Sequence, residues 1–184
     1  MVRWALPLVP LLLLTGIGFS TATAGDSGRS KKAEKVRVVR VIDGDTLEVK
    51  IEGAGRRDVR LIGIDTPETV KPRTPVECGG KPAARVLKRL VDGERVRLIT
   101  DRTQDDRDRF GRLLRYVERG PMDIGLAQVE AGLAKVVSFD GRFSRFKNYR
   151  QAEGRAKGSQ RGSWGRPCRG DFHHPRAAQG GDFF

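Results

Sequence analysis

The sequence predicts a small barrel of five β-strands with three accompanying helices, an arrangement of the α+β class. Three observations carry this prediction. Short segments in which apolar and charged residues alternate recur between residues 35 and 117, with turn-forming residues between them. A segment of helical periodicity follows the third of these segments. Two further helical segments follow the fifth.

Each predicted strand shows the two-residue repeat of a half-buried strand. In the second strand, Leu47, Val49 and Ile51 share one face, whereas Glu48 and Lys50 share the other. Short turns join the first three strands, which therefore form a meander. The predicted strands are residues 35–42, 46–51, 59–64, 94–100 and 113–117.

The predicted helices carry apolar residues at helical spacing. In the first, Leu87, Leu90 and Val91 share a face, and Pro82 suits the first turn. An order of three strands, a helix, two strands and further helices is the pattern of a five-stranded OB-fold barrel. The polar segment 101–109 is predicted to be a mobile loop. The predicted helices are residues 81–91, 124–133 and 143–156.

A chain of 184 residues is long enough for one domain with tails. The start of the chain has a positive charge, then an apolar run, and then Ala22-Thr23-Ala24, a small-residue cleavage site typical of secretory signals. A membrane anchor is the alternative, although the apolar run is short for a bilayer and contains prolines. The predicted divisions are a signal peptide at 1–24, a flexible leader at 25–34, the barrel domain at 35–165 and a mostly disordered tail at 166–184.

The chain contains two cysteines, Cys78 and Cys168. A small even number of cysteines in an exported protein is usually paired, so we expect a disulfide between a mid-chain loop and the C-terminal segment. In a cytosolic protein the same residues would be two free thiols.

Two acidic motifs lie at the ends of the first three strands. Asp43-Gly44-Asp45-Thr46 joins the first strand to the second, and Asp65-Thr66-Pro67-Glu68 follows the third. Carboxylates at the ends of neighbouring strands can converge, and their oxygens, with carbonyls and water, suit a hard divalent cation such as calcium. Either motif alone is also an ordinary turn or loop, because Asp-Gly is a common hairpin turn.

Two arginines near these motifs are candidates for binding a phosphate. Arg60 lies five residues before Asp65, and Arg112 opens the fifth strand. Guanidinium groups match the equatorial oxygens of a phosphoryl group under attack, which gain negative charge. Strict alternation along one strand would place Arg60 and Asp65 on opposite faces, which argues against their convergence. Most of the 36 lysines and arginines are expected to be surface charges.

The stretch from residue 36 to residue 164 resembles the staphylococcal nuclease family. The resemblance implies an OB-fold barrel with three helices. It also implies calcium-dependent hydrolysis of DNA and RNA that leaves 3′-phosphate ends. The matching motifs, in order, are VIDGDT at 41–46, RLIGIDTPE at 60–68, DRFGR at 108–112, EAGLAKV at 130–136 and GSW at 162–164.

The resemblance also implies a metal site. Asp45 and Asp65 are expected to bind calcium through their side chains, and Thr66 through its carbonyl. Asp43 is expected to support these ligands without contacting the ion.

The resemblance further implies catalytic roles. Glu68 is expected to position or deprotonate the attacking water, while Arg60 and Arg112 bind the phosphate and stabilise the transition state. Cys78 and Cys168 are not required by the general family pattern and resemble a disulfide of a secreted branch, which would hold the loop after Glu68.

Two departures from the family pattern leave base preference open. The family often has a tyrosine where this chain has Phe110, so a phenol is lost while the aromatic face is kept. Aromatic residues also commonly follow the Gly-Leu-Ala-Lys-Val segment, where this chain has Val137, Ser138 and Phe139. Stacking of a base on an aromatic side chain is worth about 1–3 kcal/mol.

Three functions are compatible with a net charge of +13, which predicts attraction to polyanions. The first is a secreted monomeric nuclease that acts on DNA and RNA, without a stable protein partner and away from the membrane after signal cleavage. The second is an oligonucleotide-binding barrel without turnover. The third is a polyanion-binding surface protein retained by its N-terminal segment. The first is favoured, because a binding module has no reason to retain the full set of acidic and basic site residues.

Overall fold

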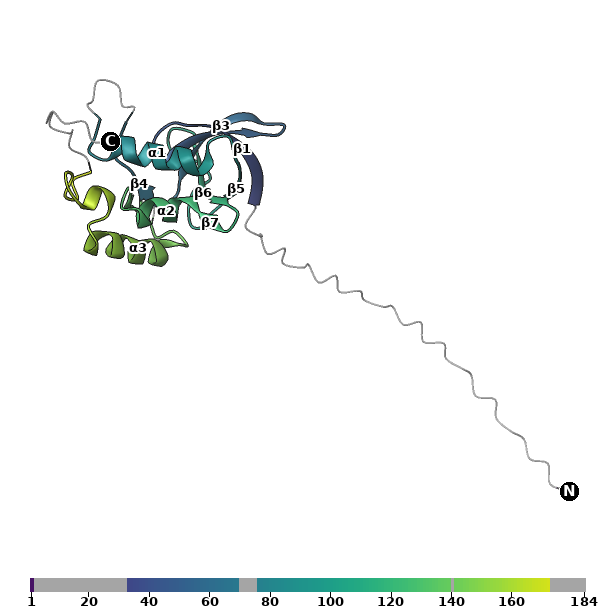
Figure 1. Cartoon of the computed structure of the whole chain (residues 1–184). Coiled ribbons are helices and arrows are strands. Elements are labelled where there is room, and N and C mark those ends of the chain that lie inside the picture. The colour runs from purple at the N-terminus through teal and green to yellow at the C-terminus, as the bar shows by residue number, and fades with distance from the viewer. Residues whose placement is uncertain (2–32, 70–75, 140, 173–184) are drawn as a thin grey trace.

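The computed structural model describes residues 33–69, 76–139 and 141–172, together with Met1. The predicted signal peptide beyond Met1, the leader up to residue 32 and the tail from residue 173 lie outside the described residues. Figure 1 shows a β-barrel with helices packed around it. No helix in this part of the chain has the length and apolar composition needed to cross a membrane.

Five strands close into a barrel: β1 (Ala33–Val41), β2 (Thr46–Ile51), β3 (Gly55–Leu61), β5 (Arg95–Ile99) and β6 (Leu113–Arg119). The order of neighbours is β3-β2-β1-β5-β6, and each of these pairs is antiparallel. A parallel pairing of β3 with β6 then closes the sheet on itself. The predicted five-stranded OB-fold barrel is confirmed.

The third predicted strand, residues 59–64, is wrong, because a turn at Ile62–Gly63 divides it. β3 ends before this turn, and the two-residue strand β4 (Ile64–Asp65) follows it. Gly63 has a φ of 78°, in the left-handed region that favours glycine. A Cβ atom at this position would also overlap the ring of Phe143. The turn therefore depends on glycine, and it changes the direction of the chain just before the second acidic motif.

The three predicted helices are present with shifted ends: α1 (Gly80–Val91), α2 (Ile124–Glu130) and α3 (Phe146–Gly158). α2 begins after Asp123, whose side chain accepts a hydrogen bond of 3.1 Å from the backbone N–H of Leu126. α2 ends earlier than predicted because Gly132, with a φ of 71°, turns the chain out of the helix.

Three short elements were not predicted. β7 (Met122–Asp123) extends the sheet by pairing with β6, and β8 (Lys135–Val136) pairs with β4 in a separate two-stranded sheet. η1 (Gly162–Trp164) is a single 3₁₀ turn. Elements of two or three residues are shorter than the periodic patterns that identify strands and helices.

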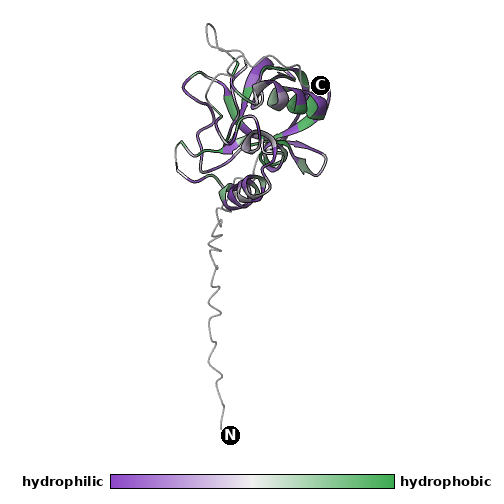
Figure 2. Cartoon of the chain, turned by 60° about the vertical axis from the view of Figure 1, so that its left-hand side comes forward, coloured by the Kyte–Doolittle hydropathy of each residue, from purple (hydrophilic) through white to green (hydrophobic). Residues whose placement is uncertain are grey.

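The barrel interior contains the apolar faces of the strands. Leu47, Val49 and Val59 are fully buried, and Lys50 on the opposite face is exposed. Figure 2 shows hydrophobic and hydrophilic stretches in succession along the barrel. The core continues towards α3, where the ring of Tyr149 packs edge-to-face on the ring of Phe143, with 5.3 Å between the ring centroids.

Asp101 anchors the polar loop that follows β5. The sequence predicted this whole loop, residues 101–109, to be mobile. The Asp101 carboxylate is buried and accepts hydrogen bonds from Tyr116 Oη, from the backbone N–H and Oγ1 of Thr103, and from Ser144. Burial alone would favour the neutral acid, but these hydrogen bonds outweigh it and hold the pKa of Asp101 well below its usual range. The loop start and the approach to α3 are therefore fixed to β6.

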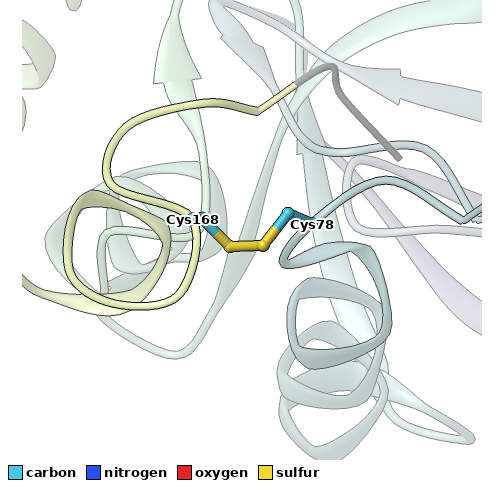
Figure 3. Close-up of a disulfide and its surroundings, with 2 residues drawn as sticks. All are labelled: Cys78 and Cys168. Carbon is cyan, nitrogen blue, oxygen red and sulfur yellow. A yellow bond between two sulfur atoms is a disulfide. The ribbon is translucent and has the colours of Figure 1, made fainter. Parts of the chain in front are cut away.

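The segment after η1 packs back onto the domain. Cys168 forms a disulfide with Cys78, which lies in the loop before α1 (Figure 3). The ring of Phe172 is fully buried, with its centroid 4.7 Å from that of Trp164. Residues 166–172, which the sequence analysis assigned to the tail, are thus attached to the barrel by both a covalent bond and aromatic packing.

Candidate active site

The turn between β1 and β2 buries two carboxylates. The backbone N–H of Asp45 donates a hydrogen bond of 3.0 Å to Oδ1 of Asp43, and the N–H of Ile42 donates one of 2.9 Å to the carbonyl of Thr46. Asp43 and Asp45 are 9% and 5% exposed, respectively. Such a tight turn aims both side chains into the protein rather than into solvent.

Asp45 joins the first acidic motif to the second. Its Oδ2 accepts a hydrogen bond of 2.8 Å from the backbone N–H of Thr66 and one of 3.0 Å from Thr66 Oγ1. Gly44 permits this approach, since a Cβ atom there would lie 2.6 Å from Thr66 Oγ1 and 2.7 Å from the Cβ of Ala83. The two motifs, 21 residues apart, therefore form one rigid unit.

Arg60 lies between the carboxylates of the two motifs. Its Nη2 is 3.2 Å from Asp45 Oδ2 and 3.1 Å from Asp65 Oδ1, and its side chain is largely buried. Its Nη1 donates to the carbonyl oxygens of Leu61 at 3.0 Å and Ile64 at 2.7 Å. The expectation from strict alternation, that Arg60 and Asp65 lie on opposite faces, is wrong because the turn at Gly63 interrupts the strand between them.

Arg112 reaches the same end of the barrel from the beginning of β6. Its Nη1 is 3.5 Å from Thr46 Oγ1, a weak contact, and its Nε donates a hydrogen bond of 2.6 Å to Asp108 Oδ2. The parallel pairing of β3 with β6 sets Arg60 opposite Leu114, so Arg112, which directly precedes β6, lies beside the strand that carries Arg60.

Asp108 was part of a quoted motif but was assigned no role from the sequence. Its Oδ1 accepts hydrogen bonds from the backbone N–H groups of Phe110 at 2.9 Å and Arg112 at 3.0 Å. Burial opposes the charged carboxylate, but the hydrogen bonds from Arg112 and Phe110 outweigh burial and lower the pKa of Asp108. Asp108 thus stays ionised and holds the guanidinium in place.

Glu68 begins the segment that leads towards α1. Its backbone N–H donates a hydrogen bond of 2.8 Å to Glu77, and its carbonyl accepts one of 3.0 Å from the Glu77 N–H. Its Oε1 accepts a hydrogen bond of 3.0 Å from the backbone N–H of Thr69. Glu77 is followed by Cys78, so the disulfide lies one residue from the pair of hydrogen bonds between Glu68 and Glu77.

The acidic residues of the site disfavour further negative charge. Burial, the charge of Asp45 and, more weakly, the charge of Glu68 raise the pKa of Asp43 to about 7. Several carboxylates share one end of the barrel, so a cation bound there would be stabilised by all of them.

Gln128 on α2 is a site residue that sequence reasoning missed. Its fully buried amide donates hydrogen bonds to the carbonyls of Gly44 at 2.7 Å and Ala83 at 3.0 Å. In the sequence it is one polar residue in an amphipathic segment, a pattern that normally indicates the solvent-facing side of a helix. No signal in a single sequence distinguishes it from a surface glutamine.

Two exposed aromatic side chains lie in the segments where this chain departs from the family pattern. Phe110 is 68% exposed and Phe139 is 78% exposed. The guanidinium carbons of Arg109 and Arg112 lie 4.8 Å and 5.4 Å from the centroid of the Phe110 ring. The hydroxyl of Ser138 donates a hydrogen bond to the nearby carbonyl oxygen of Gly141.

Two guanidinium groups and a set of buried carboxylates at one end of an OB-fold barrel have the chemistry of a phosphodiester-cleaving nuclease. The model of the family described as "Staphylococcal nuclease homologue" matches residues 58–166, more than half of the chain. The chain belongs to the staphylococcal nuclease family, and it is a nuclease that hydrolyses phosphodiester bonds.

Similar proteins agree with this assignment. The thermonuclease of Staphylococcus hyicus is 34% identical over 160 residues, which cover 85% of this chain and 93% of that protein. The thermonuclease of Staphylococcus intermedius is 44% identical over 109 residues, covering 59% of this chain and 63% of that protein. Endonuclease YncB of Bacillus subtilis (strain 168) is 34% identical over 139 residues, covering 75% of this chain and 65% of that protein.

Proposed function

We propose that this protein is a secreted, calcium-dependent nuclease that hydrolyses DNA and RNA and leaves 3′-phosphate ends. One observation carries the proposal: Arg60 bridges the carboxylates of Asp45 and Asp65, and Arg112 directly precedes the adjacent strand β6. This arrangement supports a site that holds a phosphate between guanidinium groups and an oxygen-rich metal site.

Arg60 and Arg112 bind the phosphate to be cleaved. As water attacks phosphorus, negative charge grows on the equatorial oxygens, and rigid guanidinium forks stabilise that charge. Arg60 is held by two backbone carbonyls and Arg112 by Asp108. Because these contacts fix both groups before substrate binds, little reorganisation is needed in the transition state.

Glu68 positions or deprotonates the attacking water. It is the carboxylate that follows Asp65 and Thr66, and it is close enough to Asp43 to influence the pKa of that residue. A carboxylate that accepts a proton from water must be ionised and within hydrogen-bond reach of it.

The donor set fits calcium. Asp45 and Asp65 contact the same guanidinium nitrogen, which brings hard oxygen ligands together, and calcium binds such ligands with carbonyl and water oxygens. Within the described ranges, no group of three or more His, Cys, Asp or Glu side chains could hold a metal ion. The Thr66 carbonyl and water molecules would complete the coordination, with Asp43 supporting the ligands. Bound calcium would polarise the phosphate and neutralise charge.

Secretion as a monomer is part of the proposal. The N-terminal residues have the composition of a signal peptide, and the disulfide between Cys78 and Cys168 is typical of proteins that fold in oxidising compartments. Mature protein that begins near Gly25 and is recovered from the culture medium would support this part.

The experiment that tests the proposal is cleavage of single-stranded DNA, duplex DNA and RNA by the purified mature protein, first with calcium and then with a chelator. We expect cleavage that requires calcium and products that end in 3′-phosphate. The Glu68→Gln variant should lose turnover by orders of magnitude while nucleic-acid binding largely survives. Tight, salt-sensitive binding without cleavage would instead favour an oligonucleotide-binding barrel.

A further inference from the structure

Four basic residues form a row across the outside of the barrel. In the strand registers, Arg56 on β3 lies opposite Lys50 on β2, Lys50 lies opposite Arg37 on β1, and Arg37 lies opposite Arg95 on β5. All four residues are exposed. Cross-strand partners point to the same face of a sheet, so these side chains form a continuous line, here called the basic row.

The basic row opposes folding. Like charges directly opposite each other on neighbouring strands are destabilising, and the strands here are about 4.8 Å apart. Of the four residues, Arg56 forms an ion pair with Glu48 at 2.9 Å. Lys50, Arg37 and Arg95 have no ion-pair partner among the residues that the structure describes. Arg37, Lys50 and Arg95 therefore contribute no ion pair to the fold in the described part of the chain, and we look for their role in binding.

The basic row shares its face with the candidate active site. Thr46 and Lys50 are both on the outer face of β2, four residues and about 14 Å apart. Thr46 lies opposite Arg60, just as Lys50 lies opposite Arg56. The same two strands therefore carry the site at one end and the row at the other.

Two acidic residues lie between the row and the site, and two arginines pair with one of them. Glu48 and Asp58 are opposite each other on β2 and β3. Glu48 forms ion pairs with Arg40 at 3.1 Å and Arg56 at 2.9 Å. The charge of Glu48 is therefore compensated, so this carboxylate does not repel a polyanion that passes over the face.

We propose that the basic row is a second contact for the nucleic-acid substrate, which binds backbone phosphates about 14 Å from the bond being cleaved. This inference rests on the proposed function. Three strand spacings give the row a length of about 14 Å. A narrow line of cations fits a linear polyanion, whereas adhesion to a membrane calls for a broad basic face with apolar or aromatic residues.

The contact is independent of base sequence, because it involves phosphates alone. It increases affinity for chains long enough to reach from the site to the row and does nothing for shorter ones. The row therefore makes substrate length a determinant of affinity.

The test compares two triple variants of the intact protein with the same loss of charge. The row variant is Arg37→Gln, Lys50→Gln and Arg95→Gln. The control variant is Arg85→Gln, Lys147→Gln and Arg155→Gln, which removes exposed charges from α1 and α3. Binding to a 20-nucleotide DNA strand is measured in chelator over a range of salt concentrations. Turnover is measured on that strand and on a nitrophenyl ester of a single nucleotide.

For the row variant, we expect the Kd for the 20-nucleotide strand to rise about tenfold. The slope of log K against log salt should become smaller by about 2, because each of the three lost phosphate contacts contributes about 0.7. Turnover of the nucleotide ester should not change. The melting temperature should be equal or higher, because repulsion is removed. The single variant Lys50→Gln should reduce the slope by about 0.7.

Equal weakening in the row and control variants would show an effect of net charge and would overturn the proposal. So would weakened binding to heparin or to vesicles of anionic lipid with unchanged binding to DNA. If the wild-type protein cleaves neither substrate, the proposed function fails, but the binding comparison still decides whether the row contacts nucleic acid.

Discussion

The side-chain amide of Gln128 donates a hydrogen bond of 2.7 Å to the carbonyl oxygen of Gly44. Gly44 stands between Asp43 and Asp45, so a buried residue of α2 fixes the turn that carries two carboxylates of the site. The same amide donates to Ala83 on α1 at 3.0 Å. One side chain thus connects two helices to the site.

Replacing Gln128 with leucine should reduce both stability and activity. Two buried carbonyl oxygens would lose their donor, which costs about 1–3 kcal/mol in the free energy of unfolding. The cleavage rate should fall as well, since the turn would no longer be held. Urea unfolding and initial rates measure the two effects, with Gln151→Leu on the exposed face of α3 as the control. A cleavage rate equal to that of the wild type would show that Gln128 is not needed to position the carboxylates of the site.

Arg112→Ala should reduce turnover about 10²- to 10³-fold, because a donor aimed at developing charge is lost. Binding to a long DNA strand should be largely retained, since many other cations contribute to it. Single-turnover cleavage and a binding isotherm on the same strand measure the two quantities. Wild-type turnover in this variant would refute the role proposed for Arg112.

Asp108→Ala should reduce kcat about tenfold to a hundredfold without removing any group that contacts substrate. The Arg112 guanidinium would lose its hydrogen bond to the Asp108 carboxylate and become mobile. The control is Asp105→Ala, an exposed carboxylate of the same loop. If both variants lower kcat equally, the effect belongs to the loop charge and not to the position of Arg112.

Asp101 should make stability dependent on pH in the acid range. Its pKa is lowered in the folded protein, so its stabilising effect is present above the unfolded-state pKa of about 3.9 and is lost as the pH falls below it. Asp101→Asn should therefore be less stable than wild type at pH 7, with a smaller difference at pH 3. Urea unfolding at the two pH values measures this, and a difference independent of pH would contradict it.

Reduction of the disulfide should destabilise the protein by about 4–5 kcal/mol, because the bond joins residues 90 positions apart. The double variant Cys78→Ser and Cys168→Ser should show the same loss without a reductant. Denaturant unfolding with and without dithiothreitol measures the effect. A reductant that shifts the double variant as much as the wild type would show that the bond is not the cause.

The sequence predicted the barrel well because each strand has a clear alternation and each turn has glycine or aspartate. It misjudged the relation of Arg60 to Asp65 because alternation assumes an unbroken strand, and the glycine conformation that breaks this one leaves no periodic signal. Gln128 and Asp101 were missed for a related reason. Both are polar residues whose partners lie far along the chain, and burial of a polar group becomes evident only when those partners are brought together.

The parallel pairing of β3 with β6 also has a consequence for the behaviour of the protein in solution. Each of the five barrel strands has a hydrogen-bonded neighbour on both sides. An open sheet would present the backbone of an outermost strand as a template for a strand of another molecule, which is a route to amyloid-like aggregation. Closing the barrel occupies this template along residues 59–61 of β3 and 113–115 of β6, which disfavours edge-to-edge association through these strands.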